Sequence, residues 1–464
     1  MASRGVARLH PSAGHLQDAL VEIPDTSYAI TPDGVYIAYQ VIGDGPIDVV
    51  WHPDWPGNID MEWDDQQGLH WFREVSSFSR MILYDRRGIG LSSRNVPLPN
   101  LETRVSDLLM VLDAVGSERP ILAGIFESAA PAALLAAAKP ERVLSLVWIE
   151  PNPRFAWAPD YPWGRTSADM EAELRDIELW GTRAYGRAFQ QDEAERGNVM
   201  PEALVGLMAK WSRNACTPDV ARALSRIWYE SDVRSVLPAV QVPTLILTWR
   251  GSPIDFARSR HVASLIPGAE LREMPGEMWS EEGLVAGAEE LRRFVGLERK
   301  PIEFDTILST VLFTDIVGST EKQASLGDHG WKRLVERHHA IVRDSLERWH
   351  GVENDTAGDG FFATFDGPAR AIRCAQEVAG RVRDLGIEIR AGVHTGECEL
   401  IDGKIGGIAV SIGARVAANA GPSEVLISQT VKDLVAGSGL VFDAAGEHEL
   451  KGVPDRWRLY RVTD

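Results

Sequence analysis

The sequence predicts two mixed α/β domains in series, an open parallel-sheet domain followed by a smaller α+β domain. Three observations predict this organisation. The chain has 464 residues, which is more than a single hydrophobic core usually serves. Short apolar strand patterns alternate with helical patterns through its first part, as is typical of a parallel sheet with helices on both faces. Twelve of the fifteen tryptophans precede residue 297, so the composition changes at that point.

The first part is expected to span residues 23–297, after a leader at residues 1–22. Short buried strands are predicted at 47–51, 81–84, 121–124, 143–149 and 244–247. Helices are predicted between them, notably at 101–115 and 129–138. From about residue 153 to 235 amphipathic helices interrupt the alternation, such as those at 168–185 and 201–211. The simplest interpretation of this interruption is a helical cap inserted above the sheet.

The second part is expected to span residues 307–464, after a polar linker at 298–306. Strands are predicted at 309–315, 360–365 and 387–394. Helices are predicted at 331–349, 368–385, 409–420 and 428–434. Strands and helices are therefore mixed in this part as well.

Composition limits the classes of partner. The net charge of −19 argues against non-specific binding to nucleic acid or to an anionic membrane. The three cysteines include no CxxC pair, which favours a reducing, cytoplasmic location over a disulfide framework or a structural zinc site. No apolar run approaches the length of roughly 18 residues that crosses a bilayer, and the N-terminus lacks the apolar core of a secretory signal.

Two segments of the first part resemble the α/β-hydrolases. Tyr84-Asp-Arg-Arg-Gly-Ile-Gly-Leu-Ser-Ser93 is similar to a strand-to-loop segment of that family. Leu122-Ala-Gly-Ile-Phe-Glu-Ser-Ala-Ala-Pro131 is similar to the strand and helix that carry its nucleophile. The resemblance covers roughly residues 23 to 297 and implies an α/β-hydrolase-like domain with a helical cap.

The catalytic triad of that family is degenerate in this sequence. The nucleophile turn should read G-x-S-x-G, but Phe126 stands at the serine position. Ser252 stands where the family's acid normally follows a glycine, and Trp279 where its histidine follows a Pro-Gly. Hydrolysis is therefore not expected, and the domain is interpreted either as a sensor of a small apolar ligand or as a structural, dimerising unit.

Three residues near these positions offer alternatives for the lost groups. Ser128 lies two residues after the nucleophile position, inside the first helical turn, so its side chain is expected to point elsewhere. Asp255 is a candidate for a displaced acid, and His261 lies too early to be the base. An active esterase stays open as the least favoured reading.

The second part resembles the bacterial class III adenylate and guanylate cyclases. The motifs that carry the resemblance follow one another in the family's order: Thr310-Val-Leu-Phe-Thr-Asp-Ile-Val-Gly-Ser-Thr320, Thr356-Ala-Gly-Asp-Gly-Phe-Phe362, Gly392-Val-His-Thr-Gly-Glu397, Val410-Ser-Ile-Gly-Ala-Arg415 and Glu449-Leu-Lys-Gly-Val453. The resemblance implies a ferredoxin-like core and cyclisation of ATP or GTP to a 3′,5′-cyclic nucleotide with release of pyrophosphate.

Asp315 and Asp359 match the family's two metal-binding aspartates. Two divalent ions, Mg²⁺ or Mn²⁺, suit such carboxylates and can assist an intramolecular phosphoryl transfer. Ile316 is expected to add its backbone carbonyl to one metal. The backbone N–H groups of the next residues, Val317, Gly318 and Ser319, are expected to hold the terminal phosphates.

Three further residues match groups that act on the nucleotide. Arg415 matches the arginine that stabilises the transition state, and Lys451 matches a lysine that binds the triphosphate. Ser411 stands where the family usually has asparagine. In this family the metal aspartates come from one subunit, and the base-reading, arginine and lysine groups come from the other, so the resemblance implies a homodimer.

The base-reading residues depart from the adenylate cyclase pattern. Asp355 stands where lysine is usual, and Lys404 where aspartate is usual. A carboxylate at 355 with an ammonium group at 404 suits the donors and acceptor of guanine better than those of adenine. The alternative is that the two side chains pair with each other and read no base. The sequence thus predicts a nucleotide cyclase, with a catalytically weak signalling and ligand-binding protein as the second reading.

Overall fold

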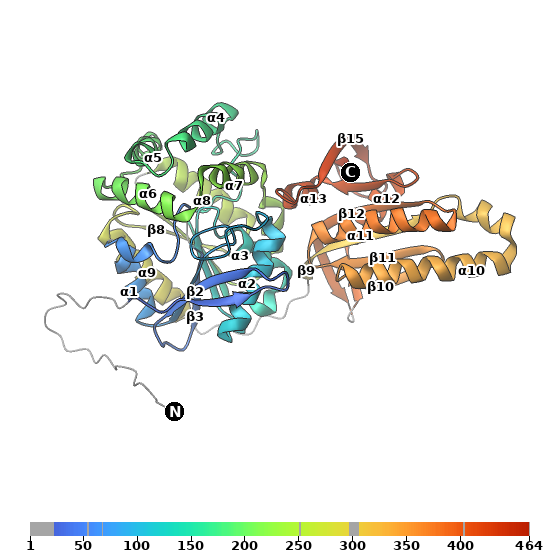
Figure 1. Cartoon of the computed structure of the whole chain (residues 1–464), viewed down its shortest axis with the longest axis horizontal. Helices are drawn as coiled ribbons and strands as arrows, with labels where there is room; N and C mark the ends of the chain where they lie inside the picture. The colour runs from blue at the N-terminus through green and yellow to red at the C-terminus, as the bar shows by residue number, and fades with distance from the viewer. Residues whose placement is uncertain are drawn as a thin grey trace.

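The computed structural model describes residues 23–52, 55–66, 68–249, 252–296, 306–401 and 404–463, without the side chains of Ile401 and Lys404. The predicted leader and residues 298–305 of the predicted linker lie outside these ranges. The described chain forms two sheets with their own helices, which lie side by side in Figure 1. No helix in the described ranges has the length and apolar character that crossing a membrane requires.

The first sheet has the strand order β1-β2-β4-β3-β5-β6-β7-β8. Its strands are β1 (Ser27–Ile30), β2 (Tyr36–Ile42), β3 (Asp48–His52), β4 (Arg80–Tyr84), β5 (Ile121–Ile125), β6 (Ser145–Ile149), β7 (Thr244–Trp249) and β8 (Glu270–Met274). β2 is antiparallel to both of its neighbours, whereas the strands from β4 to β8 are parallel. The central strands β5, β6 and β7 are buried at every position, as expected of parallel strands covered on both faces. This is the predicted α/β-hydrolase-like sheet.

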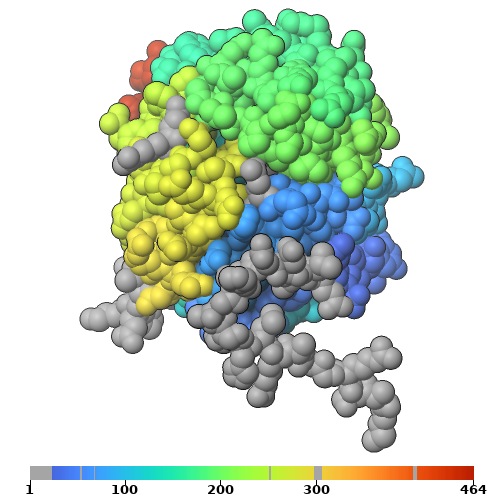
Figure 2. Space-filling view, turned by 90° about the vertical axis from the view of Figure 1, so that its left-hand side faces the viewer, coloured from blue at the N-terminus to red at the C-terminus, as the bar shows by residue number. Residues whose placement is uncertain are grey.

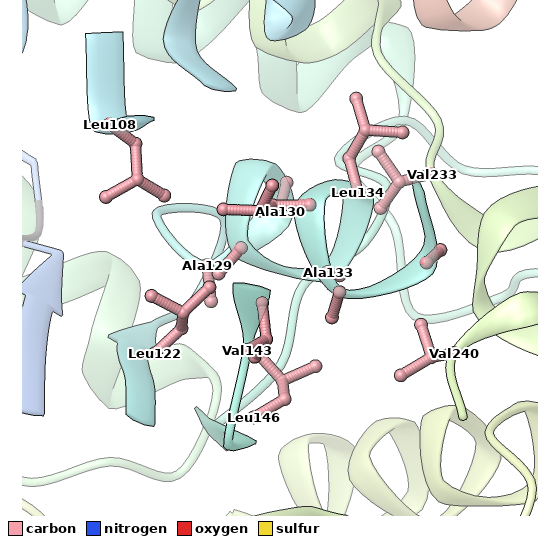
Figure 3. Close-up of a cluster of buried hydrophobic side chains, with 14 of the residues drawn as sticks. Leu108, Leu122, Ala129, Ala130, Ala133, Leu134, Val143, Leu146, Val233 and Val240 are labelled. Atoms are coloured by element: carbon pink, nitrogen blue, oxygen red, sulfur yellow. The ribbon is translucent and has the colours of Figure 1, made fainter. Parts of the chain in front are cut away.

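Alternate residues of each strand serve the two faces of this sheet. On one face Leu122 and Leu146 pack with α2 (Leu101–Val115), α3 (Ala130–Ala138) and α8 (Pro253–Leu265). On the other face Ile121 and Val147 pack with α1 (Gly68–Ser76) and α9 (Glu281–Val295). In Figure 3 the small side chains of α3 lie close to Leu122 and Leu146. An alanine-rich helix therefore packs closely on the sheet.

Four helices follow β6 and precede β7: α4 (Ser167–Asp176), α5 (Arg183–Glu195), α6 (Glu202–Ala215) and α7 (Pro218–Glu230). They form the predicted helical cap, which lies above the sheet in Figure 1 and makes the upper part of the face in Figure 2. The helix predicted at 168–185 is two helices, because Gly181 adopts a positive φ of 77° and Thr182 caps the start of α5.

The second sheet has the order β10-β11-β9-β12-β14-β16-β15, with β13 beside β12. Its strands are β9 (Thr306–Ile316), β10 (Val352–Ala357), β11 (Gly360–Phe365), β12 (Ile389–Ile401), β13 (Lys404–Gly406), β14 (Val425–Ser428), β15 (Val441–Glu449) and β16 (Arg456–Thr463). With α10 (Ser319–Arg348) and α11 (Pro368–Arg381), the strands β9 to β12 make a β-α-β-β-α-β unit, the predicted ferredoxin-like core. Helix α12 (Ile408–Asn419) packs near β9 and β12, and α13 (Gln429–Leu434) follows β14.

Helix α10 begins at Ser319, twelve positions before the predicted start at 331. Its first part is set at an angle to the rest, because Gly327 interrupts the helix with φ 66° and ψ 168°. β9 likewise begins at Thr306, inside the segment predicted as linker.

The two sheets are joined by contacts between their flanking elements. Leu308 of β9 and Leu434 of α13 are buried in the hydrophobic cluster that contains α2 and α3. Gln241 donates a hydrogen bond to the backbone carbonyl of Thr306 at 3.0 Å. On α2, Glu102 forms an ion pair with Arg370 of α11 at 2.9 Å. The start of β9 is therefore part of two cores, and its end reaches the predicted metal site.

Candidate active site

The end of β9 carries the first predicted metal ligands. Asp315 and Ile316 are its last two residues, and the Asp315 side chain is 37% exposed. Across the antiparallel β9–β12 pair, Arg390 lies directly opposite Asp315. Its Nη2 and Nε donate to Oδ2 of Asp315 at 2.6 and 3.1 Å. The first aspartate is therefore accessible and is held by a cationic neighbour.

The turn between β10 and β11 carries the second aspartate. β11 pairs with β9, with Phe361 opposite Thr314, so the turn lies beside the end of β9. Oδ2 of Asp359 accepts a hydrogen bond from the N–H of Ile316 at 3.2 Å. The fold thus brings Asp315, Ile316 and Asp359 together at one end of the sheet.

The electrostatics of this group suit a cation. Burial, and then the carboxylate of Asp315, raise the pKa of Asp359, against a smaller lowering by hydrogen bonds from backbone groups and from Ser319. A divalent cation beside both carboxylates would relieve this repulsion. In the described part of the chain no cluster of three or more His, Cys, Asp or Glu side chains could hold a metal. The residues therefore fit ions that take their remaining ligands from water or substrate phosphates.

One of the three N–H groups predicted to hold phosphates already has a partner within the chain. The N–H of Val317 donates to the backbone carbonyl of Glu388 at 2.9 Å, so it is already used within the sheet. Gly318 has a φ of 67° and precedes α10, whose first residue is Ser319. The first N–H groups of a helix have no partner within the helix. The N–H groups of Gly318 and Ser319 therefore stay the candidates for phosphate binding.

The residues expected to act on the nucleotide gather on another surface. Ser411 and Arg415 are exposed one turn apart on α12. Nε of Arg415 donates to the backbone carbonyl of Lys451 at 3.1 Å. The structure therefore brings Ser411, Arg415 and Lys451 together. Within the described ranges no hydrogen bond or ion pair connects these three residues with Asp315 or Asp359.

Only one member of the predicted base-reading pair has a described side chain. Asp355 is exposed on β10, where its Oδ1 accepts a hydrogen bond from the N–H of Thr356 at 2.9 Å. Lys404 begins β13 and pairs with Ile401, but its side chain lies outside the described part. Base reading by these residues and their mutual pairing both stay predictions.

The turn after β5 keeps the backbone of a nucleophile elbow without the nucleophile. Phe126 adopts a φ of 49°, a conformation that is rare for a large residue. Its ring lies 6.5 Å from that of Trp279, centroid to centroid. Two aromatic rings therefore face each other at the places where the sequence predicts that serine and histidine have been lost.

The alternative hydrolytic groups are engaged elsewhere. The Ser128 hydroxyl is 1% exposed and donates to the carbonyl oxygens of Ile125 and His52. Ser252 caps α8 by accepting from the N–H of Asp255. Asp255 forms an ion pair with Arg258 at 2.8 Å.

His261 does not fill the place of the missing base either. Its ring packs against that of Trp163 at a centroid distance of 4.8 Å. Burial lowers its pKa. Among the residues that the structure describes, neither His261 nor the three residues above forms part of an acid–base–nucleophile chain.

Residues 303–463 match the family profile described as Adenylate and Guanylate cyclase catalytic domain. The C-terminal domain is a class III nucleotide cyclase domain. Two uncharacterised proteins of Mycobacterium tuberculosis (strain ATCC 25618 / H37Rv) resemble it. One is 30% identical over 152 residues, covering 31% of this chain and 27% of that protein. The other is 31% identical over 105 residues, covering 21% and 20%. The chain spans about a quarter of the length of these curated relatives.

Solved structures resemble each part of the chain. The adenylyl cyclase CyaB from P. aeruginosa is 20% identical and covers 34% of this chain and 95% of its own, with a TM-score of 0.32. The bromoperoxidase from Bacillus anthracis is 20% identical and covers 58% of this chain and 99% of its own, with a TM-score of 0.49.

Two charged residues near the cyclase and hydrolase-like sites escaped the sequence analysis. Arg390 of the cyclase domain holds Asp315, and only the register of β9 on β12 reveals this contact. Glu127 was noted only as part of the elbow motif. It is 6% exposed and binds both Arg86 and Arg104 at 2.9 Å. Glu127 thus joins both arginines to the turn, but sequence spacing gave no signal for the pairing.

Proposed function

We propose that this protein converts ATP or GTP to a 3′,5′-cyclic nucleotide and pyrophosphate. The observation that carries the proposal is the placement of Asp315 and Asp359 at one sheet end, joined by the hydrogen bond from Ile316 to Asp359. In the reaction the ribose 3′-oxygen loses its proton and forms a bond to the α-phosphorus. The bond from that phosphorus to the bridging oxygen of the β-phosphate breaks, and pyrophosphate leaves.

The chain's own residues supply position and charge. Asp315, Asp359 and the carbonyl of Ile316 would hold two Mg²⁺ or Mn²⁺ ions, which when bound lower the charge on the phosphates and favour ionisation of the 3′-hydroxyl. The N–H groups of Gly318 and Ser319 would orient the terminal phosphates. Arg415 would neutralise charge that develops at the α-phosphate, and Lys451 would bind the triphosphate.

The proposal includes a homodimer with shared active sites. Ser411, Arg415 and Lys451 lie together on a surface that no described hydrogen bond or ion pair connects to the aspartates. A second copy that offers this surface to the aspartates of the first would complete the site. Two-fold symmetry would then create two such sites.

Mixing of two inactive variants tests this arrangement. Asp359→Asn and Arg415→Ala are each expected to be inactive. In a mixture of equal amounts half of the dimers are mixed, and each mixed dimer holds one intact site, so about a quarter of wild-type activity should return. An inactive mixture that nevertheless forms mixed dimers would contradict shared sites.

The proposed regulatory role of the hydrolase-like domain rests on α2. Arg104 of this helix binds Glu127, which follows Phe126 in the elbow. Two residues earlier, Glu102 binds Arg370 of the cyclase domain, whose side chain also donates to Ser106 of α2 at 3.2 Å. A change at the elbow would therefore shift a helix that contacts both domains. We propose that this domain senses a ligand rather than cleaves one.

The decisive experiment is an assay of the full chain. ATP or GTP is supplied with Mn²⁺ or Mg²⁺, and the cyclic nucleotide is separated and quantified. We expect activity in the wild type, its loss in Asp315→Asn and Asp359→Asn, and no change in Asp443→Asn, an exposed carboxylate of β15. Binding of nucleotide without turnover would favour the weaker signalling protein, for which the short Ser411 side chain and the Arg390–Asp315 ion pair argue.

A further inference from the structure

A cavity of about 160 Å³ lies next to the elbow, with residues of the cap in its wall. Phe126 lines it from the elbow, and Phe155, Phe189 and Trp228 add further aromatic walls. Phe155 stacks on Trp228 with a centroid distance of 6.2 Å and an interplanar angle of 20°. An apolar cavity of roughly 150 Å³ can hold a benzene ring. One side of the cavity therefore suits a single aromatic ring.

The wall of the same cavity also carries an arginine with an unsatisfied hydrogen-bond donor. Arg196 lines the cavity, and its side chain is 18% exposed. The ion-pair contact nearest to it is Asp192, whose Oδ2 lies 3.7 Å from Nε, beyond hydrogen-bonding distance. Nε is buried without a hydrogen-bond partner among the described residues. A buried guanidinium with an unsatisfied donor is costly, so it calls for an acceptor from outside the chain.

The neighbouring carboxylates, in contrast, are engaged with other side chains. Glu173 accepts a hydrogen bond from the Tyr229 hydroxyl, and its Oε1 lies 2.7 Å from Nε of Arg165. The carboxylate of Asp192 accepts hydrogen bonds from both Nη atoms of Arg165. Asp255 is paired with Arg258 at 2.8 Å. Glu193 accepts a hydrogen bond from Asn198 at 2.9 Å. Because these acids are already engaged, the hydrogen-bond donor at Nε of Arg196 stays available for an incoming anion.

The charges around Arg196 point the same way. Burial, and then the guanidinium groups of Arg165 and Arg258, lower the pKa of Arg196. Burial and the two neighbouring guanidinium groups therefore make the positive charge of Arg196 more costly, although Asp192 and Glu193 offset part of the effect. A carboxylate bound at Arg196 would relieve both the missing hydrogen bonds and the repulsion.

We propose that this cavity binds a small aromatic monocarboxylate, with its carboxylate on Arg196 and its ring against Phe126, Phe155 and Trp228. The proposal names a ligand class for the sensor role proposed above. Binding itself does not depend on that role; only an effect of the ligand on the cyclase does. The ligand leaves unchanged, because Phe126 has no atom that can attack it.

Binding is measured directly, by calorimetry and by the fluorescence of Trp228 and its neighbour Trp55, whose ring centroids lie 4.8 Å apart. The probes are benzoate and phenylacetate. Phenylacetamide and 2-phenylethylamine have similar size without the negative charge. We expect both carboxylates to bind the full chain, and the amide and the amine to bind at least tenfold more weakly.

Arg196→Gln should weaken phenylacetate binding at least tenfold. Arg187→Gln changes an exposed arginine of α5, the helix that ends just before Arg196, where it pairs with Glu202. This variant should leave binding unchanged, and thermal unfolding checks that both variants fold. The proposal is overturned by any of three results: neither carboxylate binds, the amide or the amine binds as tightly as phenylacetate, or Arg196→Gln binds phenylacetate like the wild type. Because this experiment measures ligand binding, an inactive cyclase would not contradict it. Likewise, absence of ligand binding would not contradict the proposed cyclase activity.

Discussion

The carboxylate of Glu102 accepts a hydrogen bond from the backbone N–H of Ala369 at 3.0 Å, although 267 positions separate the two residues. Ala369 lies in the first turn of α11, whose N-cap residue Gly367 has no side chain to offer. A carboxylate at a helix N-terminus is favourable, and here it comes from the other domain. The Glu102 side chain is only 11% exposed, so water replaces it poorly.

Removal of this carboxylate should destabilise the whole chain. Glu102→Ala leaves the N–H of Ala369 and the guanidinium of Arg370 with fewer acceptors, which we expect to cost about 1–3 kcal/mol of unfolding free energy. Urea denaturation measures it. Glu118→Ala, an exposed acid near the C-terminal end of α2, is the control. Equal midpoints for Glu102→Ala and the control would show that the contact contributes nothing in solution.

Base preference should follow Asp355 and Lys404. We expect GTP to be used at least as well as ATP, because Asp355 can accept from guanine N1–H and N2–H₂ while Lys404 donates to O6. The double exchange Asp355→Lys with Lys404→Asp should shift the ratio of the two rates toward ATP by about tenfold or more. Each single exchange should lower the rate with both substrates. A strong ATP preference that the double exchange leaves unaltered would mean that these side chains do not read the base.

Ester hydrolysis should be absent and should not return with a single serine. Phe126→Ser restores a hydroxyl at the elbow, but Trp279 still occupies the place of the base, so p-nitrophenyl acetate should be cleaved only at the background rate. Wild-type cleavage that disappears in Ser128→Ala would show the opposite. The buried hydrogen bonds of Ser128 make that variant less stable, so its folding must be checked in parallel.

Acid should weaken the fold through His394. Burial lowers the pKa of His394 from 6.5 to about 3. Below pH 6.5 the unfolded chain therefore binds a proton at this histidine, whereas the folded chain does not. The free energy of unfolding is highest above pH 6.5 and falls as the pH is lowered toward 3, by up to about 1.4 kcal/mol per pH unit.

The variant His394→Asn should reduce this dependence without abolishing it, because burial also lowers the pKa of His52 to about 3 and that of His338 to about 4. Asparagine cannot titrate, yet it keeps a polar group for the Ser428 hydroxyl, which lies 2.8 Å from Nδ1. Urea titrations at pH 7, 6 and 5 give the slopes for both proteins. Identical slopes would exclude His394 as the proton site.

Asp359→Asn should separate stability from activity. The amide removes the charge that is disfavoured by burial and by Asp315, yet it can still accept the Ile316 N–H. We expect the metal-free variant to have a free energy of unfolding higher than that of the wild type by up to about 1 kcal/mol, and therefore a higher melting temperature. We expect it to have no cyclase activity. A lower melting temperature without metal would contradict the repulsion between the two aspartates.

Local patterns predicted the strands and helices that form one continuous apolar or amphipathic run. β11 has the predicted bounds 360–365, and α2 the bounds 101–115. The β15–β16 hairpin was missed, because its strands carry many exposed charged residues, such as Glu447 and Arg458. The pairing of β16 with β14 is a tertiary contact that no local pattern records.

The candidate site divides in the same way. Motifs located Asp315 and Asp359, because their neighbours form turns and strand ends with a recognisable order. Arg390 escaped because its role depends on a register between two strands 75 positions apart. Arg196 escaped because an unsatisfied donor is defined by what surrounds it, and the cap that surrounds it has no motif.

The burial of Leu308 and Leu434 in the core of the hydrolase-like domain bears on how the chain melts and how it could be divided. A fragment that starts at residue 307 would present these leucines to water, each with a burial energy of about 1.5–3 kcal/mol. The two domains should therefore unfold in one cooperative transition. Transfer of this cyclase domain to another sensor would require either a new apolar partner for the start of β9 or polar residues in place of the leucines.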